Sequence, residues 1–141
     1  MTDPIEAIQA EAARIEEAAR TAARGHEAAA KPWGHLHLWL GIPITLLAAA
    51  GVSTFSDHPV IAGILEIIVA VGTALVTFMN PSERHVRHAE AGHGYQALHN
   101  DARIFREVDC AVEAEAAALA ARLRELNQRR NDLNEDSPAL R

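Results

Sequence analysis

The chain has 141 residues, of which 49% are hydrophobic, and a formal net charge of −6. This charge argues against nucleic acid as the main partner, because phosphate binding needs a clustered basic surface. The single cysteine, Cys110, excludes an internal disulfide. Apolar and charged residues are segregated along the chain. Between Leu38 and Met79 there is no Lys or Arg, and only two acids occur, Asp57 and Glu66.

The composition of residues 1–31 predicts an N-terminal cytoplasmic helix, because it is dominated by Ala, Glu and Arg, which are strong helix formers. Asp3 is suited to cap the helix and Pro4 to occupy its first position. Apolar residues recur at spacings of three and four, which is typical of a helix that packs along another helix as in a coiled coil. This stripe consists of Ile5, Ile8, Ala12, Ile15, Ala19 and Ala22.

Residues 32–79 predict a transmembrane hairpin with spans at about 35–55 and 60–79. Each apolar run is roughly 20 residues long, which suits a membrane-spanning helix. Trp33 and His37 precede the first run and form an amphipathic belt suited to a membrane–water interface. The turn from Ser56 to Pro59 is so short that the two helices must be antiparallel.

The basic residues next to the spans predict the orientation of the hairpin. Arg24 and Lys31 precede the first span, and Arg84 and Arg87 follow the second, whereas the connecting turn has neither Lys nor Arg. Because basic residues stay on the cytoplasmic side, we expect a multi-pass protein with both termini in the cytoplasm.

The sequence predicts one long C-terminal cytoplasmic helix over residues 80–133, which begins with Asn80 and Pro81. It predicts a flexible tail over residues 134–141. This helix is longer than the N-terminal arm with which it would pair in antiparallel fashion. Its unpaired part must bend back or pair with another subunit, and we therefore predict a homo-oligomer.

Glu66 is the most unusual residue of the spans, because a carboxylate inside hydrocarbon usually faces a cavity, a pore or a partner. It shares a small and polar stripe with Ala70, Thr73 and Thr77, and Thr45 and Ser53 lie on a similar stripe of the first span. One hypothesis is that these residues line an oligomeric pore, in which Glu66 forms a carboxylate ring that favours cations. The alternative is that the stripes only let the two helices pack closely.

No catalytic or metal-binding motif is recognisable. His85 and His88 share a helix face, but neither a cysteine nor an acidic cluster completes a standard ligand set. The sequence has no glycine-rich phosphate loop and no nucleophile elbow. We therefore expect a protein that is not an enzyme and that has no cofactor and no metal.

The chain resembles the SLATT family of bacterial two-transmembrane effector proteins. The likeness covers about Lys31 to Asp109 and is carried by three segments. These are the entry into the first span from Trp33 to Pro43, the exit from Phe78 to Arg84, and a later signature that includes Tyr95, Leu98, Ala102, Arg103, Phe105 and Arg106. The resemblance implies a place in the bacterial inner membrane and a role in antiviral defence, where members of the family are thought to form pores when a separate sensor or nucleotide-signalling partner is triggered.

The sequence thus predicts an all-α integral membrane protein with a two-transmembrane helical hairpin and long antiparallel cytoplasmic arms. The function we expect is that of an effector that oligomerises in membrane lipid and forms a regulated pore or disrupts the membrane. One alternative is a scaffold that recruits partners through its cytoplasmic helices without conducting ions. Another is a soluble four-helix protein whose two apolar helices form its core.

Overall fold

The computed structural model describes residues 3–54, 58–113 and 115–140, without the side chains of 51–54. The described residues are almost all helical. The elements are α1 (Pro4–Thr54), α2 (Pro59–Met79), α3 (Pro81–Ile104), the π-helix η1 (Phe105–Asp109), α4 (Cys110–Val112) and α5 (Ala116–Asp136). The expected turn at Ser56 and Asp57 lies outside the described residues.

The chain forms two compact units, of which the first combines two segments that are distant in the sequence and the second is continuous. Unit 1 comprises Met1–Ala29 and Arg87–Arg141, and unit 2 comprises Ala30–Val86. Both α1 and α3 contribute residues to both units, so the N-terminal helix does not end at residue 31 as the sequence predicts. Pro32 and Pro43 lie inside α1, which continues through them.

The start of α1 follows the sequence prediction. The backbone N–H of Ile5 donates to Oδ1 of Asp3 at 3.0 Å, so the aspartate satisfies one of the free amides of the first turn. The next helix boundary is also confirmed, because α3 begins at Pro81. Asn80, between α2 and α3, has the left-handed backbone conformation (φ 41°) that Asn tolerates better than most residues.

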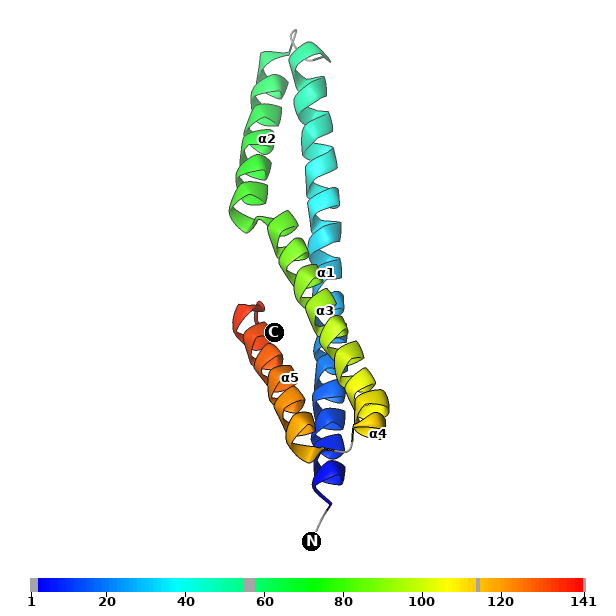
Figure 1. The fold of residues 1–141 in the computed structure, drawn as a ribbon. Helices are drawn as coiled ribbons and strands as arrows, with labels where there is room; N and C mark the ends of the chain where they lie inside the picture. Colours follow the sequence, from blue (N-terminus) through cyan, green and yellow to red (C-terminus); the bar gives the residue numbers. More distant parts are fainter. Residues whose placement is uncertain (1–2, 55–57, 114, 141) are drawn as a thin grey trace. The chain divides into compact units, whose positions relative to one another are not determined.

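Unit 1 is a three-helix bundle in which α3 and α5 run alongside the first part of α1 (Figure 1). His99 of α3 contacts Glu16 of α1, and Tyr95 of α3 contacts Asn134 of α5. The core combines alanines from α1 with larger side chains from the other helices. Its fully buried residues include Ala12, Ile15, Ala19, Ala23, Leu98, Ala102, Phe105 and Leu119. The predicted coiled-coil stripe is therefore buried from Ile8 to Ala19, whereas Ile5 is only partly buried and Ala23 takes the place expected for the partly buried Ala22.

The prediction of a single helix over residues 80–133 is wrong. The helix ends at Val112, and Glu113 and Glu115 have extended backbone conformations (ψ 122° and 105°). Glu115 is the residue that precedes α5, and its backbone N–H donates to Oε1 of Glu113 at 2.9 Å. Of the two alternatives for the overhang, the structure shows the bend. Folding back buries Leu119 against Ile8, Ala12, Phe105 and Cys110.

The π-helix η1 shifts the buried face of the helix by one residue before the chain turns. In a regular helix, Asp109 would follow Phe105 on the buried face, four residues later. The wider π-turn adds one residue, so that Cys110 is buried instead and Asp109 forms an ion pair with Arg122 of α5 at 3.3 Å. The apolar stripe is thus maintained although the sequence has an acid at the heptad position.

The prediction of a flexible tail over residues 134–141 does not hold up to Leu140, because this segment makes defined contacts within unit 1. Residues Asn134–Asp136 belong to α5, and the hydroxyl of Tyr95 donates to Oδ1 of Asn134 at 2.7 Å. Leu140 packs beside Gly25, where a Cβ atom would lie 2.8 Å from Cδ1 of the leucine. Gly25 thus provides space for the leucine beside α1. Arg141 lies outside the described residues.

Unit 2 contains the helical hairpin. The second part of α1 packs against α2, and Ile44 lies so close to Gly72 that a Cβ there would be 2.8 Å from its Cδ1 atom. No residue of α2 is fully buried. Large apolar side chains are exposed on both helices: Leu38, Trp39, Ile42, Leu46, Leu47, Val60, Ile61, Ile64, Ile67, Ile68, Val71, Leu75 and Phe78. Both helices are long and apolar enough to cross a membrane.

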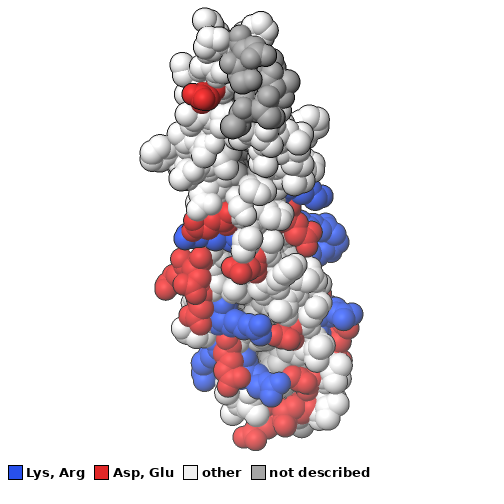
Figure 2. Space-filling view, turned by 90° about the horizontal axis from the view of Figure 1, so that it is seen from above, with Lys and Arg blue, Asp and Glu red and all other residues white. Residues whose placement is uncertain are grey.

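Figure 2 shows the same segregation on one face of the molecule, where Lys, Arg, Asp and Glu crowd one part of the surface and are almost absent from the rest.

Candidate functional site

The face of α2 that packs against α1 is a narrow apolar stripe. Leu65, Val69, Gly72 and Val76 are half-buried and recur at spacings of four, three and four. On α1, Leu40 and Ile44 are half-buried in the same way. These apolar residues and the close approach at Gly72 provide the contact within the hairpin.

The small and polar stripe of α2 lies on a different face. Glu66, Ala70, Thr73 and Thr77 are all exposed and recur at the same spacings of four, three and four. Each follows a residue of the contact stripe in the sequence, so this face is turned by about 100° from α1. The bulky residues Ile64, Ile68, Val71 and Leu75 are exposed on the opposite side of the contact stripe. The second helix of the hairpin therefore has three distinct faces.

Glu66 lies at the edge of a groove between α1 and α2. The groove has a volume of about 260 Å³, and its lining consists of Leu47, Ala48, Ala62, Leu65, Glu66, Val69 and Ala70. The carboxylate is the only charged group in this lining.

Two hydroxyl groups of the stripes, those of Thr45 and Thr77, form hydrogen bonds within their own helices. Oγ1 of Thr45 donates to the carbonyl of Gly41 at 2.8 Å, and Oγ1 of Thr77 donates to the carbonyl of Thr73 at 2.9 Å. Such bonds remove the cost of placing a hydroxyl in hydrocarbon and leave the oxygen lone pairs free to face a partner. Thr45 is exposed on α1, whereas the side chain of Ser53 lies outside the described residues.

At the other end of the hairpin, aromatic and basic side chains meet. The guanidinium of Arg84 lies 4.9 Å from the ring centroid of Trp33, and its Nε donates to the carbonyl of Met79 at 3.1 Å. Nδ1 of His85 donates to the carbonyl of Ala30 at 2.9 Å. A Trp with a stacked Arg, one end apolar and the other charged, is suited to a membrane–water interface.

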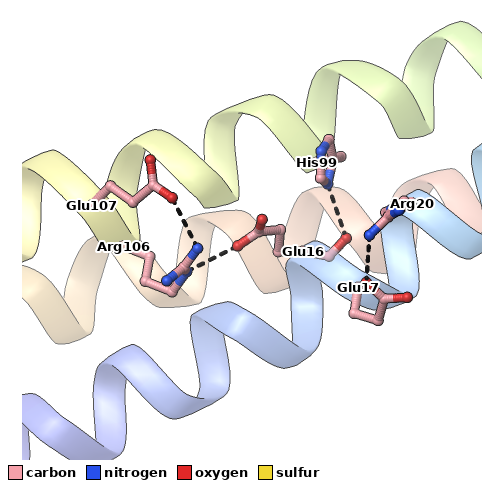
Figure 3. Close-up of polar contacts among 6 residues, drawn as sticks. All are labelled: Glu16, Glu17, Arg20, His99, Arg106 and Glu107. Carbon is pink, nitrogen blue, oxygen red and sulfur yellow. Dashed lines mark hydrogen bonds and ion pairs between the residues drawn. The ribbon is translucent and has the colours of Figure 1, made fainter.

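Of the three segments that carry the family resemblance, the later signature, which includes Tyr95 and Phe105, lies in unit 1. Tyr95 and Phe105 are buried in its core, whereas Arg103 is exposed. Arg106 donates from Nε to Oε2 of Glu16 at 2.9 Å and from Nη2 to Oε1 of Glu107 at 3.0 Å (Figure 3). The hydrogen bond and charge of Glu16 raise the pKa of Arg106.

Glu16 holds α3 through two different groups. Its carboxylate binds Arg106, and its backbone carbonyl accepts from Nδ1 of His99 at 3.2 Å (Figure 3). Glu17 of the same helix turns instead to Arg20, at 3.5 Å. Arg106 of the signature thus connects α3 to Glu16 of α1.

A buried histidine pair in unit 1 is not recognisable from the sequence. His26 of α1 and His88 of α3 lie in the core with Nδ1 atoms 3.2 Å apart. The spacing of His26 is the one sequence feature that indicates its burial. His26 continues the buried stripe of Ala19, Ala23 and Ala30 at intervals of three and four. Polar side chains are usually excluded from such a stripe, and the predicted stripe does not extend beyond Ala22.

Over the described part of the chain, no group of three or more His, Cys, Asp and Glu residues is placed to hold a metal ion. Cys110 is buried in unit 1 beside Asp109, and burial followed by the aspartate charge raises its pKa. A thiol with a raised pKa is a weak nucleophile at neutral pH.

Comparisons with protein-family models, with curated proteins and with solved structures give no match to this chain. The resemblance to the SLATT family thus stays a prediction that depends on the residues quoted above.

Proposed function

We propose that the chain is a membrane effector whose hairpin inserts into a lipid bilayer, oligomerises and forms a regulated cation pathway. Glu66, Ala70, Thr73 and Thr77 line the pathway, and Thr45 and Ser53 of α1 contribute to the same protein-facing surface. Following the family resemblance, we place this activity in the bacterial inner membrane, with both termini in the cytoplasm, as part of an antiviral response.

The exposed apolar surface of unit 2 supports insertion. Leu46, Val60 and Phe78 are 64%, 74% and 88% exposed, and the bulky residues opposite the small stripe are 49–55% exposed. Transfer of each such side chain from water to apolar surroundings gains about 1.5–3 kcal/mol. Lipid provides these surroundings along the whole length of both helices, which argues against the soluble four-helix alternative.

The observation that carries the pore proposal is the direction of Glu66. The carboxylate is exposed and lies beside the stripe that packs against α1, at a groove that Leu47 and Ala48 of α1 also line. A charged group at the centre of a span costs about 2.5–3.5 kcal/mol on insertion scales. A second copy that packs on this face, with water along the small residues, removes the carboxylate from hydrocarbon. The bulky face of Ile64 and Ile68 then faces the lipid.

The bend after Val112 changes the basis for proposing an oligomer. Because α5 covers the core of unit 1 within one chain, the long overhang no longer requires a second subunit. The proposal of a homo-oligomer now rests on the hairpin faces alone. A separate sensor or nucleotide-signalling partner, as the family resemblance implies, would act on unit 1.

A passive scaffold is the second candidate, and the composition of unit 1 favours it. Its core is complete within the chain and its surface carries many charged side chains, so it is suited to bind partners without any change in the hairpin. A scaffold and an effector differ in conductance, which can be measured directly.

The test is to reconstitute the full chain in planar bilayers and to measure the reversal potential under a KCl gradient. We expect cation-selective currents from the native chain and a loss of this selectivity in Glu66→Gln. Glu90→Gln, which removes an exposed carboxylate of α3 outside the spans, is the matched control and keeps the selectivity. Unchanged selectivity in Glu66→Gln would contradict the carboxylate ring, and a native chain that inserts without conducting under any trigger supports the scaffold.

A further inference from the structure

The histidine pair links α1 and α3 through a single hydrogen bond in the core of unit 1. His26 is 2% exposed and His88 is 8% exposed, and the distance between their Nδ1 atoms is 3.2 Å. One of these nitrogens must carry a proton and the other must not, because a hydrogen bond needs one donor and one acceptor. The contact therefore exists only while at least one imidazole is neutral.

The pair belongs to a layer that joins all three long helices of the unit. The ring of Tyr95 stacks on His26, with centroids 5.4 Å apart and planes at 10°. The hydroxyl of Tyr95 in turn donates to Asn134 of α5. A change at the histidines thus reaches α5 through one aromatic ring.

The groups around the pair offer it little compensation for positive charge. On α1 the charged residues nearest to His26 in sequence are Arg24 and Glu27, both exposed, and Cγ of Glu27 lies 3.4 Å from the Cβ position of Gly92. On α3, Arg87 and Glu90 flank His88 and are also exposed.

From α5 the polar group that reaches this layer is the neutral amide of Asn134, through Tyr95. Burial lowers the pKa of His26 below its ordinary value of 6.5, and the charge of His88 lowers it further.

The sign of the pH effect follows from these surroundings. A histidine released from the layer binds a proton more readily than the buried one, so the open form takes up more protons below pH 6.5. The closed form is fully favoured above this pH and loses its advantage as the pH falls towards the lowered pKa. Each proton taken up only by the open form shifts the equilibrium by about tenfold per pH unit.

We propose that His26 and His88 form an acid-sensitive latch that holds α1 and α3 together and opens when both imidazoles are protonated. Protonation of both rings removes the only acceptor of the bond and places two positive charges side by side. In the sequence, the pair lies where unit 1 ends, three residues before Ala29 and one residue after Arg87. Acidification therefore loosens unit 1 at the point where both of its chain segments continue into the hairpin.

His99 provides a matched control on the same helix. It is half-buried, and its Nδ1 donates to the backbone carbonyl of Glu16 at 3.2 Å. A carbonyl accepts this bond from a neutral or a protonated ring alike, so acid does not break the contact. Its replacement tests whether any histidine between α1 and α3 produces the same response.

The experiment is hydrogen–deuterium exchange of the full chain in detergent micelles between pH 7.5 and 5.5, corrected for the intrinsic pH dependence of exchange. In the native chain, we expect the protection factors of residues 19–30 and 87–98 to fall below pH 6.5, by up to about tenfold per pH unit. In His26→Asn/His88→Asn, in which amides replace the bonding Nδ1 atoms without titrating, we expect pH-independent protection. His99→Asn should respond like the native chain.

Two results would overturn the latch. The first is native protection that stays constant over this pH range. The second is a double variant that is well protected at pH 7.5 and still loses protection in acid. If the asparagine variant is unprotected at every pH, His26→Leu/His88→Leu replaces it, because two leucines suit the apolar core and do not titrate. Neither test depends on whether the hairpin conducts ions.

Discussion

The two units use one continuous helix in opposite ways. In unit 1, α1 turns its apolar residues inwards, and Ile15 is 0% exposed. In unit 2, the same helix leaves Leu46 64% exposed and has no charged residue from Leu38 to its end. The difference shows that helix formation alone does not define the role of a segment. What distinguishes the two halves is the exposure of their apolar side chains, which are buried in unit 1 and exposed in unit 2.

The largest expected effect is the loss of a core leucine from the water-exposed unit. Leu98 is completely buried, so Leu98→Ala should destabilise unit 1 by about 2–5 kcal/mol through lost burial and a cavity. The same truncation at Ile68, which is 49% exposed in unit 2, should change the unfolding of unit 1 by less than about 0.5 kcal/mol. Chemical denaturation followed by circular dichroism measures both. Equal effects would mean that the two regions form one cooperative core.

The second prediction concerns two isoleucines with almost the same exposure. Ile68 of α2 is 49% exposed and Ile104 of α3 is 48% exposed. If lipid surrounds only the hairpin, Ile68→Arg costs about 2.5–3.5 kcal/mol on insertion and lowers the membrane-integrated fraction. Ile104→Arg should leave that fraction unchanged, because its side chain already faces water. Carbonate extraction of membranes provides the measurement, and equal integration of the two variants would argue that the hairpin does not enter lipid.

The smallest effect is expected at the surface of unit 1. Arg106→Ala removes the hydrogen bond to Glu16, whereas Arg103→Ala removes an exposed side chain of the same kind from the same helix. We expect a lower Tm for the first variant than for the second, with a loss well below that of Leu98→Ala, because partly exposed ion pairs contribute little. A larger loss in Arg103→Ala would show that the contact with Glu16 does not hold α1 against α3.

The sequence predicts those features that depend on local pattern. The cap at Asp3, the start of α3 at Pro81 and the two apolar helices follow from residue type and spacing within one or two turns. The bend after Val112 is different, because the glutamates and alanine that follow it are ordinary helix formers. It is determined by distant residues, since Leu119 is buried only when α5 returns along the bundle.

The remaining differences have the same origin in tertiary packing. Gly94 resembles a weak point of a helix in the sequence, but a Cβ there would lie 2.7 Å from Cδ2 of Leu133, so the glycine allows α5 to approach. The burial of His26 requires His88 from a segment 62 residues away. For the candidate site, sequence spacing predicts which residues share a stripe. The separation of the Glu66 face from the α1 contact depends on the packing of the hairpin.

The most direct test of whether the hairpin lies in lipid while unit 1 faces water is labelling of single cysteines in intact membranes. In a Cys110→Ala background, Ile68→Cys and Ile104→Cys place thiols at positions of equal exposure in the chain. A membrane-impermeant maleimide is added to inverted inner-membrane vesicles, before and after detergent and urea. We predict rapid labelling at position 104 and labelling at position 68 only after solubilisation and unfolding. Equal labelling of both positions in intact vesicles would contradict the account.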